Sequence, residues 1–130
     1  NGNCANATST TTGTDMNTMP ELVTEARRLS DLLDKGVSAL RQAAVDYANA
    51  EHEYRKEHAL AYLQTDGTVA EREAKTYGMV GELRRDRDIA DGVRAAALEA
   101  VRARRTQLSA LQSLLAAHRS EADFARTGPS

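Results

Sequence analysis

Proline, cysteine and aromatic residues are scarce in this chain of 130 residues, and each scarcity excludes a class of structure. The two prolines, Pro20 and Pro129, lie near the ends, so nothing between them interrupts a helix in the way that proline does. The single cysteine, Cys4, excludes a disulfide within the chain. There is no tryptophan, one phenylalanine and four tyrosines. β-branched residues are too sparse and scattered for a sheet, which excludes the β classes.

Long apolar runs and an excess of one charge are missing as well. No run approaches the ~18 apolar residues that a membrane-spanning helix needs, and no signal peptide is visible. The formal net charge is −2. A strongly basic nucleic-acid-binding domain would have a different balance. We therefore expect a cytoplasmic protein with no membrane contact.

The first residues differ from the rest of the chain. Residues 1–19 are rich in Thr, Asn and Gly, and Asp15 is their only charged residue. Such a segment cannot bury enough apolar surface to offset the entropy lost on ordering. The sequence predicts a disordered tail over 1–19 and one helical domain over 20–127.

Ala, Leu, Glu and Arg dominate the remainder, a composition typical of long helices and coiled coils. Apolar residues recur at spacings of three and four from Leu22 to Ala61 and again from Leu83 to Ala122. The pattern predicts an all-α fold, an antiparallel long helical hairpin. Its long helices cover about 20–65 and 82–126, and a short linking helix covers about 69–77.

The apolar pattern leaves two registers for the hairpin. Packing straight from the corner would leave the second helix longer by about 13 residues and expose the leucine-rich stretch 111–115. Two helices of equal length would instead place Tyr47 opposite Ala100 and Tyr54 opposite Val93. We favour this second register, because large side chains then face small ones.

The corner between the helices has a clear signature. Asp66 and Gly67 end the first pattern, since glycine tolerates the left-handed conformation that ends helices. Thr68 and Glu71 have the spacing of a capping box, in which each side chain accepts a hydrogen bond from a free backbone N–H. We interpret these four residues as a structural turn and cap without catalytic chemistry.

No arrangement of residues indicates catalysis or a bound cofactor. His52 and His58 lie among glutamates, but a spacing of six residues turns their imidazoles to different faces of a helix, whereas metal pairs use three or four. No serine has an ordered His–carboxylate partner. We expect a non-enzymatic protein with no metal, no cofactor and no small-molecule substrate.

Five arginines of the second long helix project to one flank of its apolar face. They could contact phosphates or a protein partner, or they could pair along their own helix with Asp88, Asp91 and Glu99. They are Arg84, Arg87, Arg94, Arg102 and Arg105.

A sixth arginine, Arg104, projects into the middle of the apolar face, where a buried charge needs a partner. The favoured register brings Asp46 within one turn of it. We predict an Arg104–Asp46 pair that fixes the register. Because two helices of about 65 Å bury only a narrow seam, we also expect a homodimer that forms a four-helix bundle.

The stretch from about residue 30 to 126 resembles a group of small all-helical proteins of bacterial temperate phages and prophages. The elements that carry the resemblance are GTVAEREA at 67–74 and QLSALQ at 107–112. The resemblance implies a phage or prophage accessory protein linked to DNA replication or recombination in a bacterial cytoplasm, and it implies no active-site residues.

Three functional hypotheses are therefore open. The first is a protein-interaction and oligomerisation protein. The second is a nucleic-acid-binding protein that uses the five arginines. The third is a structural or assembly factor of a virion.

Overall fold

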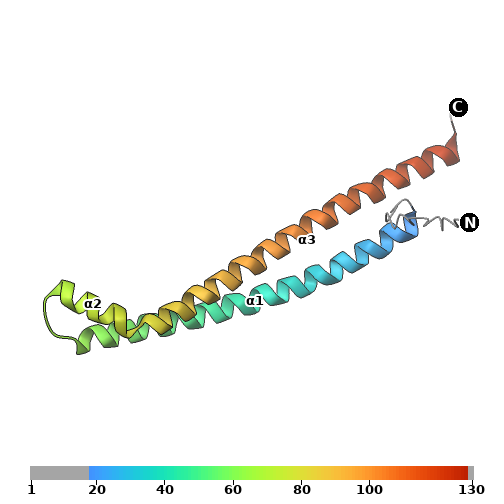
Figure 1. Ribbon diagram of the computed structural model, residues 1–130. Helices are drawn as coiled ribbons and strands as arrows, with labels where there is room; N and C mark the ends of the chain where they lie inside the picture. The colour runs from blue at the N-terminus through green and yellow to red at the C-terminus, as the bar shows by residue number, and fades with distance from the viewer. Residues whose placement is uncertain (1–17, 129–130) are drawn as a thin grey trace, which may run out of the picture.

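The computed structural model describes residues 18–128 and contains three helices (Figure 1). They are α1 at Met19–Gln64, α2 at Val69–Met79 and α3 at Gly81–Thr127. The two long helices lie side by side in opposite directions, and α2 lies at the corner, far from the first turn of α1 and the last turn of α3 (Figure 1). No strand occurs within the described residues. The predicted all-α hairpin with its linking helix is confirmed, and the helix bounds agree within two residues.

The beginning of α1 follows from Pro20. Proline lies in the first turn, where its missing N–H costs nothing, and Thr18 occupies the N-cap position, although its side chain accepts no capping hydrogen bond. The predicted tail, 1–19, falls outside the described residues except for its last two. Of these, Met19 already belongs to α1.

The corner depends on the backbone conformation of Gly67. Its φ of 122° lies in the region that favours glycine. The Thr68 hydroxyl accepts a hydrogen bond from the backbone N–H of Glu71 at 3.2 Å and thereby caps α2. The Glu71 side chain folds over the turn, so a Cβ at Gly67 would collide with Oε2 of Glu71.

Side chains of α2 donate hydrogen bonds to backbone carbonyls at and just beyond the C-terminal end of α1. The last turn of α1 contains no basic residue, although its unpaired carbonyls carry partial negative charge. Arg72 Nη2 donates to the Tyr62 carbonyl at 2.8 Å, and Lys75 Nζ donates to the Asp66 carbonyl at 3.0 Å. The Arg72 guanidinium carbon also lies 4.1 Å from the centroid of the Tyr62 ring. These contacts hold α2 against α1.

The break between α2 and α3 is a kink at one buried residue. Val80 is the cap of both helices and is 3 % exposed. Its N–H donates to the Thr76 carbonyl at 3.1 Å, and its carbonyl accepts from the Arg84 N–H at 2.9 Å, so hydrogen bonding continues through the kink. The break lies inside the predicted interval 78–81, but Gly78 remains helical within α2.

The register differs from the favoured prediction. A Cβ built on Gly36 of α1 would lie 3.4 Å from the Val101 side chain of α3. Near the ends of the long helices, Leu22 and Leu29 of α1 form a buried cluster with Leu111. Compared with the predicted register, α3 is shifted along α1 by roughly six to ten residues, about two to three turns.

The predicted pairing of large with small side chains was wrong for a chemical reason. Tyr47 and Tyr54 do not face Ala100 and Val93, because each tyrosine ring instead lies under an arginine of α3. A tyrosine face attracts a guanidinium, so it needs no small residue opposite. Burial of the leucine cluster and of Val101 against Gly36 therefore sets the register.

Two glycine substitutions test the account of the corner. Gly67→Ala should lower the free energy of unfolding by about 1–2 kcal/mol, because it forces a side chain into a positive φ and against Glu71. Gly78→Ala is the matched control: nothing lies within 4 Å of a Cβ there, so alanine should stabilise the helix by about 0.5–1 kcal/mol. Urea unfolding followed by circular dichroism measures both changes, and shifts of the same sign would contradict the account.

Candidate functional site

The seam between α1 and α3 has two chemically different sides. On the first, which we call the arginine–tyrosine side, arginines of α3 cover tyrosines of α1. The guanidinium carbon of Arg87 lies 4.3 Å from the Tyr54 ring centroid, and that of Arg94 lies 4.4 Å from the Tyr47 centroid. Both pairs are spaced by seven residues on each helix, which keeps them on one side of the seam.

Neighbouring carboxylates hold these arginines in place. Arg87 donates to Asp88 and also lies 3.7 Å from Glu51 of α1, while Arg94 Nη2 donates to Asp91 at 2.7 Å. The hydrogen bond that Arg87 donates to Asp88 raises the pKa of Arg87 above its ordinary value, and the bond that Arg94 donates to Asp91 raises the pKa of Arg94. The arginine–tyrosine side is therefore closed by charged groups that are already paired.

The predicted five-arginine set is largely engaged within the chain. Besides Arg87 and Arg94, Arg84 lies 3.5 Å from the Tyr77 ring centroid and donates to the Tyr77 carbonyl. Arg102 Nη1 donates to Glu99 at 2.9 Å, and Arg105 is exposed. The intrahelical pairing with Asp88, Asp91 and Glu99 that the sequence offered as one interpretation is present in the structure.

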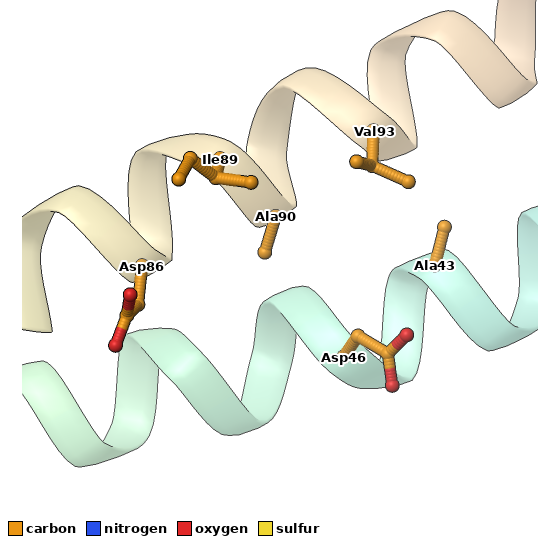
Figure 2. Close-up of a pocket in the computed structure, with 6 residues that line it drawn as sticks. All are labelled: Ala43, Asp46, Asp86, Ile89, Ala90 and Val93. Atoms are coloured by element: carbon orange, nitrogen blue, oxygen red, sulfur yellow. The ribbon is translucent and has the colours of Figure 1, made fainter.

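The second side of the seam, which we call the open face, contains three shallow grooves. The central groove is mostly apolar, with two carboxylates at its edge (Figure 2). Ala43 and Ala90 point toward each other's helix, and their small size leaves Ile89 and Val93 more than half exposed (Figure 2). The lining residues are Ala43, Asp46, Asp86, Ile89, Ala90 and Val93.

Two further grooves flank the central one. The terminal groove lies near the start of α1 and includes Arg28, Gln107 and Leu114. The corner groove lies near α2 and includes Leu60, Met79 and Leu83.

Helical spacing places the three grooves on the same face. On α1, the lining residues Arg28, Asp46 and Glu57 are separated by five and by three whole turns. On α3, Asp86, Val93, Gln107 and Leu114 are separated by multiples of seven, the repeat that keeps residues on one side of a packed helix.

Exposed apolar side chains concentrate along the open face. Ten large apolar side chains are exposed among the described residues. Half of them line the grooves of this one face: Leu60, Met79, Ile89, Val93 and Leu114. A row of this kind, bordered by polar residues, is typical of a surface that binds another protein.

The predicted Arg104–Asp46 pair is not among the ion pairs of the described residues. Asp46 lines the same groove as Ala90, and about 14 residues of helix, roughly 21 Å, separate Ala90 from Arg104. Arg104 instead donates to Gln107 at 3.1 Å, and Asp46 accepts from Gln42 at 2.9 Å. The prediction was wrong because it assumed the other register.

The part of the chain that the structure describes contains neither a cluster of metal ligands nor a helix that could span a membrane. Over residues 18–128, no three His, Cys, Asp or Glu side chains converge in a way that could hold a metal ion. His58 packs against Tyr54, with the ring centroids 5.8 Å apart. None of the described helices combines the length and apolar character needed to cross a membrane.

Comparisons with known proteins return no matching family model, no matching curated protein and no matching solved structure. The role of the open face therefore has to be inferred from its own geometry. It offers apolar grooves with a few charged groups at their edges, a chemistry that suits binding.

The arginine–tyrosine side can be tested with a pair of neighbouring arginines. Arg87→Ala should lower the free energy of unfolding by about 1 kcal/mol, because it removes the cation–π contact with Tyr54 across the seam. Arg85→Ala is the control: Arg85 is mostly exposed and lies 3.9 Å from Glu82 of its own helix, so its loss should change stability little. Equal losses in urea unfolding would show that Arg87 adds nothing across the seam.

Proposed function

We propose that this protein is a non-enzymatic oligomerisation and protein-interaction protein whose open face binds a second copy of the chain. The observation that carries the proposal is the concentration of five exposed apolar side chains in the three grooves of that face. The product is a four-helix bundle, in which two hairpins cover each other's open faces.

The thin core of a single hairpin supports this proposal. The buried apolar side chains of the described residues are few for helices of 46 and 47 residues. They are Leu22, Leu29, Ala43, Ala61, Val80, Val101 and Leu111. Two helices can bury only one stripe each, so a second hairpin is the simplest way to cover the remaining apolar residues.

The energy available on the open face is moderate. Completing the burial of a half-exposed aliphatic side chain yields about 1 kcal/mol, so five such side chains on each of two copies yield on the order of 10 kcal/mol. Association costs about 4–15 kcal/mol in lost freedom of motion. The apolar gain therefore lies within the range of this cost, so the charged groups among the grooves influence both the strength and the geometry of association.

The arginines support the nucleic-acid hypothesis less well. Arg87 and Arg94 are stacked on tyrosines and paired with aspartates, so phosphate contacts would have to replace interactions that hold the hairpin together. A dimeric rod fits the third hypothesis, a virion assembly factor, as well as it fits a phage accessory protein of DNA replication or recombination. The sequence resemblance supports a phage or prophage protein of the host cytoplasm, and the oligomerisation proposal does not depend on it.

A matched pair of valine substitutions tests the proposal. Val93→Glu in the central groove should shift the protein from dimer to monomer, because a carboxylate would be desolvated beside Asp46 and Asp86. Val45→Glu should leave the dimer intact, since Val45 is equally exposed, 53 % against 54 %, but lines none of the grooves. Sedimentation equilibrium over a wide range of concentrations gives the mass, and circular dichroism checks that both variants remain helical.

Three outcomes would overturn the proposal. They are a wild-type protein that is monomeric at every concentration, a Val93→Glu variant that dimerises normally, and a Val45→Glu variant that dissociates as readily as Val93→Glu.

A further inference from the structure

We infer that the two copies meet in an antiparallel arrangement in which Arg104 of each copy lies at the level of Asp46 of the other. In this arrangement the corner of one hairpin covers the end of the other where its long helices begin and end. The inference rests on the proposed self-association. It adds the position of the two-fold axis and the pair of charges that favours this arrangement of the two copies.

Four charged groups in or beside the grooves are not among the ion pairs of the described residues: Asp46, Asp86 and Glu57, which line the grooves, and Arg104. Arg104 lines none of the grooves but is half-buried, and it lies 14 residues after Ala90 of the central groove and seven before Leu111 of the terminal groove, a spacing that keeps it on the same side of α3. The Arg104 side chain donates to the neutral Gln107. When a second molecule covers the face, these groups lose water, and a charge that loses water needs an opposite charge beside it.

The pairing of α1 with α3 fixes the position of each charged residue along the long axis of the hairpin, which we call its level. Because Gly36 lies opposite Val101, Asp46 lies opposite the Ala90–Asp91 turn of α3, where it shares a groove with Ala90. Arg104 is about 13 residues farther along α3, roughly 20 Å away. A two-fold axis that crosses the hairpin halfway, between Ala97 and Leu98, exchanges these two levels. The partner's Arg104, on the α3 helix that then covers α3, reaches the level of Asp46, which lies diagonally across the interface on α1.

A second pair of charges points to the same axis. Arg28 shares the terminal groove with Gln107 and Ala110, which places it about 11 residues beyond the Ala97–Leu98 axis. Asp86 lies about 11 residues on the other side, so the same rotation brings the partner's Arg28 to its level. Arg28 already donates to Glu25, which keeps the pKa of Glu25 below its ordinary value. The Arg28–Asp86 pair should therefore stabilise the dimer less than the Arg104–Asp46 pair does.

The alternative two-fold arrangement is electrostatically unfavourable. If the two-fold axis instead ran along the hairpin, each residue would face residues at the same position along the second copy. The acidic central grooves of the two copies would then cover each other. Asp46 and Asp86 would then face two further carboxylates, and like charges across an interface oppose association. Small residues near the antiparallel axis, Ala96 and Ala100, allow the two α3 helices to approach closely.

A charge exchange tests the pair directly. Arg104→Glu and Asp46→Arg should each weaken the dimer at least tenfold, because each leaves two like charges at one level. The double variant should restore the dissociation constant to within threefold of wild type. Arg105→Glu is the control: it changes the adjacent arginine, which is exposed whereas Arg104 is half-buried, and it should leave the constant unchanged.

Cross-linking tests the axis independently of charge. In a Cys4→Ser background, Ala96→Cys places thiols of the two copies within a few ångströms of each other along the bundle, since the residue lies next to the axis. Ala110→Cys also lies on the open-face side of α3, but its two copies should be separated by roughly 37 Å. A short thiol-to-thiol cross-linker should therefore join Ala96→Cys chains into dimers and leave Ala110→Cys chains single.

The outcomes separate this inference from the proposed function. If Val93→Glu dissociates the dimer but Arg104→Glu does not, or if the double variant fails to recover, the arrangement is wrong and self-association stands. Cross-linking of Ala110→Cys as readily as Ala96→Cys also overturns the arrangement alone. A wild-type chain that remains monomeric overturns both.

Discussion

The close approach of Val101 to Gly36 sets the register of the hairpin, and the other contacts between the long helices depend on it. A Cβ added to Gly36 would just touch the Val101 side chain, so α1 and α3 pack closely at this point, and Val101 is almost fully buried there. With that level fixed, Leu22 and Leu29 reach Leu111 near the ends of the long helices. The same level places Tyr47 and Tyr54 beneath Arg94 and Arg87.

This register makes the two sides of the seam chemically unequal. On one side, each tyrosine ring is covered by a guanidinium that is also bonded to a carboxylate, so that side is closed within one chain. On the other side, the small residues Ala43 and Ala90 leave a groove between the helices, and the neighbouring Ile89 and Val93 remain exposed. An asymmetric seam of this kind directs association to one face, whereas a symmetric one would leave two equivalent faces open.

The helices could be predicted from sequence because their ends carry local chemical signals. Pro20 suits a first turn, Gly67 adopts a positive φ, and Thr68 caps the next helix, each for reasons contained within a few residues. The register could not be predicted in this way, because sliding a helix by seven residues keeps the same face toward its partner. The apolar pattern is satisfied almost equally by several registers, and the choice among them depends on pairs far apart in the chain.

The arginines show how far sequence reasoning reached on the candidate site. Their position on one flank of α3 was predictable from helical spacing, but their contacts with tyrosine were missed. A signal was present, since Tyr47 and Tyr54 are seven residues apart, as are Arg87 and Arg94. Matched heptad spacing of an aromatic and a cation on two antiparallel helices indicates repeated cation–π contacts. No pattern in the sequence predicts the grooves, because their positions depend on the register between α1 and α3.

Arg104 connects the fold to the proposed assembly. A half-buried guanidinium bonded to a neutral amide is a poor source of stability for a single hairpin, and aliphatic residues of similar volume would pack there at lower cost. Arg104 contributes to the specificity of association instead. The apolar grooves attract a second copy in more than one orientation, whereas a desolvated charge tolerates only an orientation that supplies a carboxylate. On this interpretation the apolar residues of the open face provide the affinity and Arg104 selects the geometry.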